Sequence, residues 1–462
     1  GSDPARLGTV ATVTPEGDYL LNGVKLWATN GTLATLLVVM AQVPPSEGHR
    51  GGITAFVVEG DSPGITVERR NAFMGLRGLE NSVTRFHDVR VPAANVIGRE
   101  GQGLKIALTT LNTGRLSLPA MCVGAAKWCL GVAREWAAER VQWGLPVARH
   151  EAVAKKIAFI AGSAYGMEAV LELSCRLADD DRNDIRIEAA LAKLYTSELS
   201  WHLADELIQI RGGRGYETAD SLAARGERPI PVEQILRDLR INRIFEGSTE
   251  IMHLFIAREA VDAHLSVAGD IIDPDAKLGR KARAAARAGG FYAKWLPTLV
   301  VGRSQTPSAF SEYGPLARHL RHVERGSRKL ARETFYAMAR WQGKMERKQA
   351  FLGRIVDIGA ELYAMSAACV KAHAERESRP EGVELADLFC RQAWGRVERL
   401  FTDLWHNTDD VDVAAAARVT AGRYLHLEEG IIPAPGVGDW VSRWEYGASE
   451  TTDVRRRITT PD

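Results

Sequence analysis

The spacing of the apolar residues changes once along the chain, near Gly101, and divides the sequence into a strand-rich and a helix-rich part. Residues 1–98 contain short apolar runs separated by Gly, Pro and Asp, which is typical of antiparallel strands. Beyond Gly101 the apolar residues recur at helical spacing. We therefore expect an α+β multidomain protein, in which a small antiparallel β-barrel or sandwich precedes a set of helices.

Turn residues divide the strand-rich part further. The run at 19–27 is interrupted by Asn22-Gly23, the pair most typical of a two-residue hairpin, so two strands are expected there. The other predicted strands lie at 36–43, 53–58, 65–68 and 83–91. Together these residues predict a β-domain over 1–98.

Long helical patterns make up the rest of the chain. Four of them, at 103–139, 151–177, 185–210 and 232–265, are long enough to pack as a four-helix bundle, so a bundle domain is predicted over 99–266. A linker is predicted at 267–276. Later patterns predict a second helical domain over 277–462 and lie at 312–345, 347–377, 382–408 and 411–427.

The net charge of +1 hides a basic window. Residues 277–348 contain seventeen Lys or Arg and four Asp or Glu, a net +13. The cationic segment 277–296 ends in three aromatic residues, which is typical of a segment that lies on an anionic membrane surface. Its Gly289-Gly290 pair weakens that interpretation, and a solvated helix face or a subunit contact are the alternatives.

Two other features narrow the class of protein. No apolar run approaches membrane-spanning length by inspection of the sequence. The five cysteines show no ligand spacing and lie mostly in apolar helical patterns, which favours reduced core residues over a disulfide framework or a metal site.

Glu246 is the strongest candidate for a reactive group. It lies in a Phe-Glu-Gly-Ser-Thr run between two helical patterns, where Gly247 frees the backbone and Ser248 is placed to cap the next helix. A carboxylate beside the apolar side chains of this run is desolvated, which raises its pKa and makes it a usable base near neutral pH. The alternative is an acid that stabilises the N-terminus of a helix.

Five further segments carry unusual residue combinations. Each has an ordinary structural explanation when taken alone, such as a tryptophan in a core or a glycine pair at a helix end. They read Lys-Leu-Trp-Ala-Thr-Asn-Gly at 25–31, Met-Gly-Leu-Arg-Gly at 74–78 with Val-Arg-Val-Pro at 89–92, Asn-Thr-Gly-Arg at 112–115, Glu-Arg-Val-Gln-Trp-Gly at 139–144, and Gln-Ile-Arg-Gly-Gly-Arg-Gly-Tyr at 209–216.

In this order the segments resemble motifs of the acyl-CoA dehydrogenase family. The run around Glu246 resembles the family's "YEG(T/S)xxI", and the segments at 139–144 and 209–216 resemble "ERxQFG" and "QxxGGxGY". The chain departs from the family at 217–230, which lengthens the loop after the glycines. Some members carry the catalytic glutamate at the position of Gly114, so Glu246 is the candidate here.

The resemblance implies roles for individual residues. Glu246 would remove the α-proton of an acyl-CoA while the β-hydride passes to flavin, with its backbone N–H holding the thioester carbonyl. The implied FAD contacts are Ser2, Trp27, Thr29, Arg140, Gln142, Gln209, Gly212, Gly213, Ser248 and Glu250. The implied substrate contacts are Ser2, Asn112, Arg115 and Gly247, and no metal is implied.

The resemblance also implies a reaction and its partners. The reaction would convert fatty acyl-CoA to trans-2-enoyl-CoA in β-oxidation, and the second helical region resembles the very-long-chain subgroup. Electron-transfer flavoprotein would accept the electrons. A homodimer is implied, in the cytoplasm, at the inner membrane surface, or in the mitochondrial matrix of a eukaryote.

Two other functions stay open from the sequence: a DNA-binding flavoprotein of the same family and an acyl-CoA oxidase. We expect no nucleic-acid partner, because a DNA-binding protein does not need the base and the CoA-side residues that this chain retains. The opening Gly1-Ser2-Asp3 resembles the end of the family's flavin loop "TEPGxGSD". We therefore expect the chain to begin within that loop, after an N-terminal helical domain.

Overall fold

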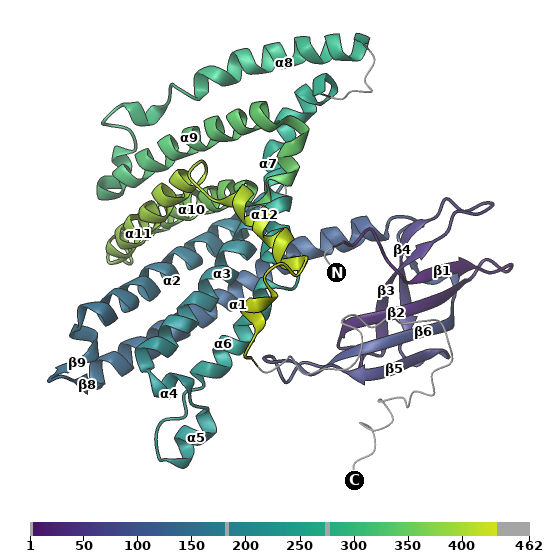
Figure 1. The fold of residues 1–462 in the computed structure, drawn as a ribbon, viewed down its shortest axis with the longest axis horizontal. Helices are drawn as coiled ribbons and strands as arrows, with labels where there is room; N and C mark the ends of the chain where they lie inside the picture. The colour runs from purple at the N-terminus through teal and green to yellow at the C-terminus, as the bar shows by residue number, and fades with distance from the viewer. Residues whose placement is uncertain (1–2, 181–183, 273–277, 432–462) are drawn as a thin grey trace. The chain divides into compact units, whose positions relative to one another are not determined.

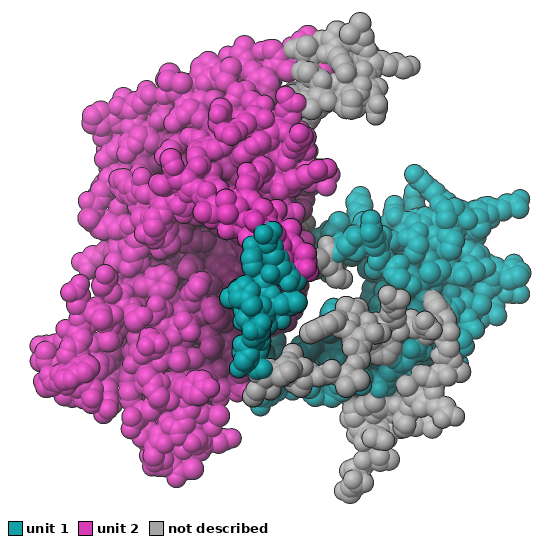
Figure 2. Space-filling model, viewed as in Figure 1, with its two compact units in different colours: residues 1–111, 422–462 teal, residues 112–421 magenta. Residues whose placement is uncertain are grey.

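The computed structural model describes residues 3–180, 184–272 and 278–431 (Figure 1). The chain forms two compact units, one of residues 1–111 with 422–462 and one of residues 112–421 (Figure 2). The first unit contains the sheet, and nearly all the helical residues belong to the second. The predicted α+β class is confirmed, while the division into three domains stays a prediction.

The β-unit is built on a seven-stranded sheet with the order β5-β6-β2-β1-β3-β4-β7. Neighbouring strands are antiparallel, except that β1 and β3 meet in parallel at a single pair, Val10 and Gln42. Inward side chains such as Leu21, Phe56 and Phe86 form its core. The strands are β1 (Val10–Val13), β2 (Tyr19–Thr29), β3 (Leu36–Val43), β4 (Gly52–Glu59), β5 (Ile65–Arg70), β6 (Asn81–Val91) and β7 (Val96–Ile97).

The hairpin predicted at Asn22-Gly23 is wrong. Strand β2 continues through this pair, and its register against β6 shifts between Leu21 and Gly23, as at a β-bulge. Asn22 exchanges two hydrogen bonds of 2.9 Å with Asp88 across the strands. Gly23 has a φ of +145°. The glycine therefore serves a bulge inside a long strand, whereas the sequence pattern alone indicates a turn.

The helical unit begins with long helices at the predicted positions. The fourth predicted helix, at 232–265, is divided by the hinge that carries Glu246. Its second part continues to residue 272, past the start of the linker predicted at 267–276. Residues 273–277 lie outside the described part of the chain. The helices are α1 (Gly103–Glu139), α2 (Glu151–Ala178), α3 (Arg186–Arg211), α4 (Gly213–Tyr216), α5 (Ala219–Ala224), α6 (Val232–Arg240) and α7 (Thr249–Ile272).

Helices α1 and α2 correct one expectation from the sequence. By length and composition alone both are apolar enough to cross a membrane. Both also contribute fully buried side chains, among them Cys129 and Ile160, to the helical core. An apolar core helix passes the same composition test, so these two helices carry no membrane assignment.

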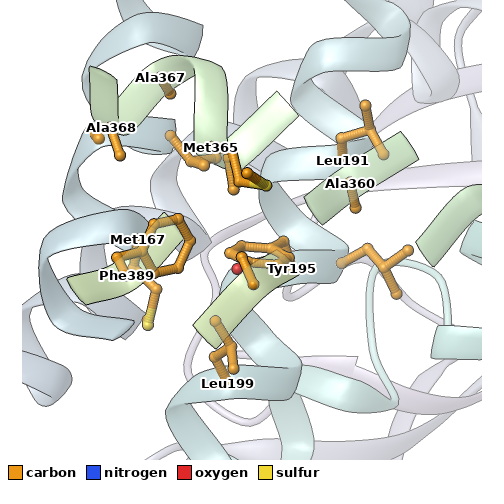
Figure 3. Close-up of a cluster of buried hydrophobic side chains, with 14 of the residues drawn as sticks. Met167, Leu191, Tyr195, Leu199, Ala360, Met365, Ala367, Ala368 and Phe389 are labelled. Atoms are coloured by element: carbon orange, nitrogen blue, oxygen red, sulfur yellow. The ribbon is translucent and has the colours of Figure 1, made fainter. Parts of the chain in front are cut away.

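The second helical region shares its core with the bundle. Helix α10 contacts α2, α7, α9 and α11, and Figure 3 shows Met365 and Phe389 packed among Met167, Leu191 and Tyr195 of the bundle. Helix α8 continues through Gly289-Gly290, so this pair does not break it. The helices are α8 (Leu278–Thr298), α9 (Ala317–Trp341), α10 (Gln349–Ala374), α11 (Gly382–Asp403) and α12 (Asp409–Thr420).

Candidate active site

Glu246 lies on a hinge with an unusual backbone conformation. Its φ is +53° and that of Gly247 is +99°, just before α7 begins. As predicted, Ser248 caps α7, because its Oγ accepts a hydrogen bond from the Ile251 N–H at 3.5 Å. A left-handed conformation at a glutamate costs roughly 1–3 kcal/mol and persists only where surrounding contacts hold it, which is common at functional sites.

Buried polar contacts hold the hinge from the neighbouring helix α3. Lys193, which is 1% exposed, donates a hydrogen bond of 2.7 Å from Nζ to the Gly247 carbonyl. Glu198 accepts hydrogen bonds from Arg243, at 2.8 Å, and from the Thr249 hydroxyl. The two helix ends that flank the hinge are thereby tied to one scaffold helix.

The carboxylate of Glu246 reaches the first long helix of the bundle. Its Oε2 atom is buried and has no hydrogen-bond partner among the described residues. A Cβ atom added at Gly114 would lie 2.8 Å from this oxygen. The position at which some family members carry the base is therefore adjacent to the Glu246 carboxylate, and glycine there leaves room for it.

Burial and two cations set the charge state of this site. Burial raises the pKa of Glu246, and Lys193 and Arg115 partly offset the rise. Burial also lowers the pKa of Lys193 to about 8. Arg115 is buried, with its Cζ atom 4.9 Å from the centre of the Phe255 ring. The arrangement is a partly desolvated carboxylate between two buried cations, which is suited to accepting a proton near neutral pH.

Sequence reasoning missed Lys193. A fully buried lysine is rare and usually has a specific partner. The sequence signal for a buried lysine was a single cation within a run of small and apolar residues, Ala-Ala-Leu-Ala-Lys-Leu-Tyr at 189–195. Its partner, the carbonyl of Gly247, lies far along the chain and could not be identified from that run.

The other predicted substrate contacts are only partly described. Asn112 lies in α1, but its side chain is outside the described part of the structure, and so is the whole of Ser2. Arg115 is near enough to the Glu246 carboxylate to lower its pKa, and Gly247 follows Glu246 on the hinge. Their contacts with a substrate stay predictions.

Two predicted FAD contacts lie in the β-unit. Trp27, near the end of β2, is 67% exposed, which leaves a large aromatic surface available for stacking. Thr29, at the end of the same strand, is exposed, and its hydroxyl accepts a hydrogen bond of 3.3 Å from Asn81.

Most of the other predicted FAD contacts lie at exposed turns of the helical unit. Arg140 leads into the hairpin of β8 (Val141–Gln142) and β9 (Leu145–Pro146), whose tip residue Trp143 is 91% exposed. Gln209, Gly212 and Gly213 are exposed where α3 ends. A Cβ atom at either glycine would meet nothing within 4 Å, so the backbone is open to close approach by a dinucleotide.

Ser248 and Glu250 also have a structural role at the start of α7. The Glu250 carboxylate accepts hydrogen bonds from its own backbone N–H and from Ser248, which lower its pKa. Both side chains therefore stabilise the start of α7. Their predicted contact with FAD is additional to this capping role and stays a prediction.

Comparisons with known proteins agree with the resemblance seen in the sequence. Three family models match: the acyl-CoA dehydrogenase middle domain at residues 1–89, the C-terminal domain at 101–261, and the bacterial-type C-terminal domain at 291–427. The probable acyl-CoA dehydrogenase FadE10 of Mycobacterium tuberculosis is 65% identical over 466 residues, covering 100% of this chain and 72% of FadE10.

More distant relatives give the same result. The human mitochondrial very-long-chain-specific acyl-CoA dehydrogenase is 37% identical over 262 residues, which cover 56% of this chain and 38% of the human protein. An acyl-CoA dehydrogenase from Bacillus anthracis, solved in complex with FAD, matches with a TM-score of 0.68 at 25% identity and covers 87% of this chain and 67% of its own. The chain belongs to the acyl-CoA dehydrogenase family.

Proposed function

We propose that this oxidoreductase catalyses α,β-dehydrogenation of fatty acyl-CoA thioesters with Glu246 as the base. The observation that carries the proposal is the half-buried Glu246 carboxylate, with its raised pKa, on a strained hinge between Lys193 and Arg115. Loss of the α-proton needs a base positioned at that carbon and ionised at the working pH. The experiment that tests it is substitution of Glu246, argued in the Discussion.

FAD is the cofactor of this family, and the residues present fit it. An exposed indole at Trp27, the glycine turn at Gly212-Gly213 and the guanidinium of Arg140 supply a stacking surface, close backbone approach and a diphosphate ligand. When bound, FAD supplies the acceptor for the substrate hydride. The chain's own part is to orient the thioester, exclude water around Glu246 and hold the α-proton on its carboxylate.

The finer assignment rests on the relatives. Fatty-acid β-oxidation of long-chain substrates is supported by the 37% identity with the very-long-chain-specific human enzyme. We propose electron-transfer flavoprotein as the acceptor and a homodimer as the assembly. Rapid reoxidation of the reduced enzyme by oxygen, with no dependence on electron-transfer flavoprotein, would instead identify an acyl-CoA oxidase.

Arg140 is expected to hold FAD across a subunit interface. Replacing it with alanine removes the guanidinium that pairs with the diphosphate, so the variant should lose FAD on dilution while the wild-type protein retains it. The flavin-to-protein absorbance ratio after gel filtration measures this. Arg134, an exposed arginine in the last turns of α1, is the matched control. A monomer that keeps stoichiometric FAD would contradict the cross-subunit part of the claim.

The basic window is more internally paired than its charge suggests. Arg318 pairs with Asp387, Arg328 with Glu324 at 3.4 Å, and Lys348 with Asp410 at 2.7 Å. The aromatic end of α8 also packs inward, with the Trp295 and Phe335 ring centres 5.4 Å apart. The membrane hypothesis therefore depends on cations whose side chains are exposed to solvent.

Three exposed cations lie on one face of α8: Arg283, Arg287 and Lys294. We expect salt-sensitive co-sedimentation with phosphatidylserine vesicles, and expect substitution of all three by glutamine to abolish it. The control replaces three exposed cations elsewhere in the window, Arg325, Lys344 and Arg347. Tight binding to DNA without vesicle binding would favour the nucleic-acid alternative.

A further inference from the structure

The helical unit contains a cavity of about 570 Å³ whose lining includes neither Glu246 nor the residues that surround it. Its walls come from the second half of α1, the end of α3, α4 and the loop at 217–230, which contains α5. Trp128, Val132, Trp136 and Ile230 give it an apolar surface. A cavity of this volume is large enough for a small organic molecule.

One buried cation in this cavity, Arg211, has no ion pair within the part of the chain that the structure describes, and Glu227, the acid that raises its pKa, is hydrogen-bonded to Arg214. Arg211, the last residue of α3, is 6% exposed, and its Nε and Nη1 atoms are buried without a hydrogen-bond partner among the described residues. Its Cζ atom lies 5.2 Å from the centre of the Trp136 ring. Burial lowers the pKa of Arg211, the nearby Arg214 lowers it further, and Glu227 offsets part of the decrease.

Two glutamates in the cavity lining are already hydrogen-bonded to arginines other than Arg211. Glu227 accepts hydrogen bonds of 2.7 and 2.8 Å from Arg214, and Glu135 accepts one of 2.7 Å from Arg228. The end of a helix and an indole ring both favour a cation, so they recover part of the cost of burying Arg211. Neither supplies the negative charge that a desolvated guanidinium normally has beside it.

The charge of the lining indicates the charge of the ligand. Four arginines and three glutamates line the cavity: Arg140, Arg211, Arg214, Arg228, Glu135, Glu139 and Glu227. Arg140 is also the proposed FAD ligand, and Arg214 and Arg228 are paired with glutamates. Arg211 is therefore the cation that one bound carboxylate would meet. A doubly charged phosphate would leave an excess negative charge beside three carboxylates.

We propose that this cavity binds a small organic monocarboxylate, with the carboxylate beside Arg211 and the apolar body against Trp128 and Trp136. The site is separate from the proposed FAD contacts, of which only Arg140 is part of the lining. Because the walls include the loop at 217–230, the proposal gives that loop a binding role.

The test compares two probes of the same shape, 1-naphthoate and the neutral 1-naphthamide, by calorimetry on the FAD-loaded protein. A charge-assisted pair with Arg211 should make naphthoate bind about 10-fold more tightly or better. In Arg211→Met this preference should fall to about one, while Arg211→Lys should keep part of it. Arg258→Met removes an exposed arginine of α7 that is not part of the lining, so it should change nothing.

Thermal unfolding provides a second readout that does not depend on activity. Naphthoate should raise the melting temperature of the wild-type protein and leave that of Arg211→Met unchanged. Without ligand, Arg211→Met should be at least as stable as the wild-type protein, because it removes an uncompensated buried charge. A large loss of stability would assign Arg211 a structural role and overturn the proposal. Equal affinity for both probes, or naphthoate binding to the FAD-free protein alone, would overturn it as well.

Discussion

Replacing Glu246 with glutamine is expected to slow flavin reduction by acyl-CoA about 10²- to 10⁴-fold, the usual contribution of a positioned base, while FAD binding is retained. Glutamine keeps the shape of the side chain and removes the proton acceptor. The measurement is single-turnover bleaching of the flavin under anaerobic conditions. Among the described residues the carboxylate has no hydrogen-bond partner to lose at Oε2, so the fold should tolerate the change.

The matched control is Asp262→Asn, which removes an exposed carboxylate of α7, the helix that follows the hinge. This variant should reduce its flavin at a rate close to that of the wild-type protein. Near-normal bleaching in Glu246→Gln would sink the assignment of the base. Loss of FAD from the same variant would point to a structural role for Glu246.

The pH dependence follows from the same carboxylate. Since the base must be ionised to accept a proton, the rate should rise with pH as Glu246 deprotonates. Burial raises the pKa of Glu246, so this rise should occur above the range of an ordinary glutamate. A rate that rises around the ordinary glutamate pKa would show that the carboxylate is solvated in the working enzyme.

The sequence predicted the long helices well because each repeats a local pattern many times. The pattern at 103–139 matches α1 at both ends. The hairpin at Asn22-Gly23 failed for a physical reason that lies outside the local pattern. Asp88, on another strand, accepts a hydrogen bond from the side chain of Asn22 and donates one to it from its backbone N–H. Glycine tolerates a bulge as readily as a turn.

In the candidate site, too, features formed by adjacent residues could be predicted from the sequence, whereas contacts between distant residues could not. Glu246, Gly247 and Ser248 could be identified because hinge, glycine and cap are adjacent in sequence. The charges around them could not, since Lys193 meets Gly247 across 54 positions. The basic window was misleading in the same way, because Arg318 pairs with Asp387, 69 positions later. A run of charge does not specify which of its members find partners after folding.

Replacing Lys193 with methionine is expected to lower the maximal rate of flavin reduction about 10²-fold with little change in substrate affinity. The hydrogen bond from Nζ to the Gly247 carbonyl, at 2.7 Å, holds a hinge whose two residues both have positive φ. Without it the base is free to move, and a displacement of about 1 Å costs a reaction roughly 10²-fold. Stopped-flow bleaching at several substrate concentrations separates the rate from the affinity.

Lys193→Gln separates the hydrogen bond from the charge. Glutamine retains an N–H donor for the hinge but removes the cation that lowers the pKa of Glu246. Its plateau rate should therefore lie closer to that of the wild-type protein, while the rise of rate with pH moves upward in both variants. If Lys193 only supported the fold, both substitutions would lower stability and leave the pH profile in place. A shifted profile with a preserved plateau in Lys193→Gln thus identifies Lys193 as a positioning residue that also sets the basicity of Glu246.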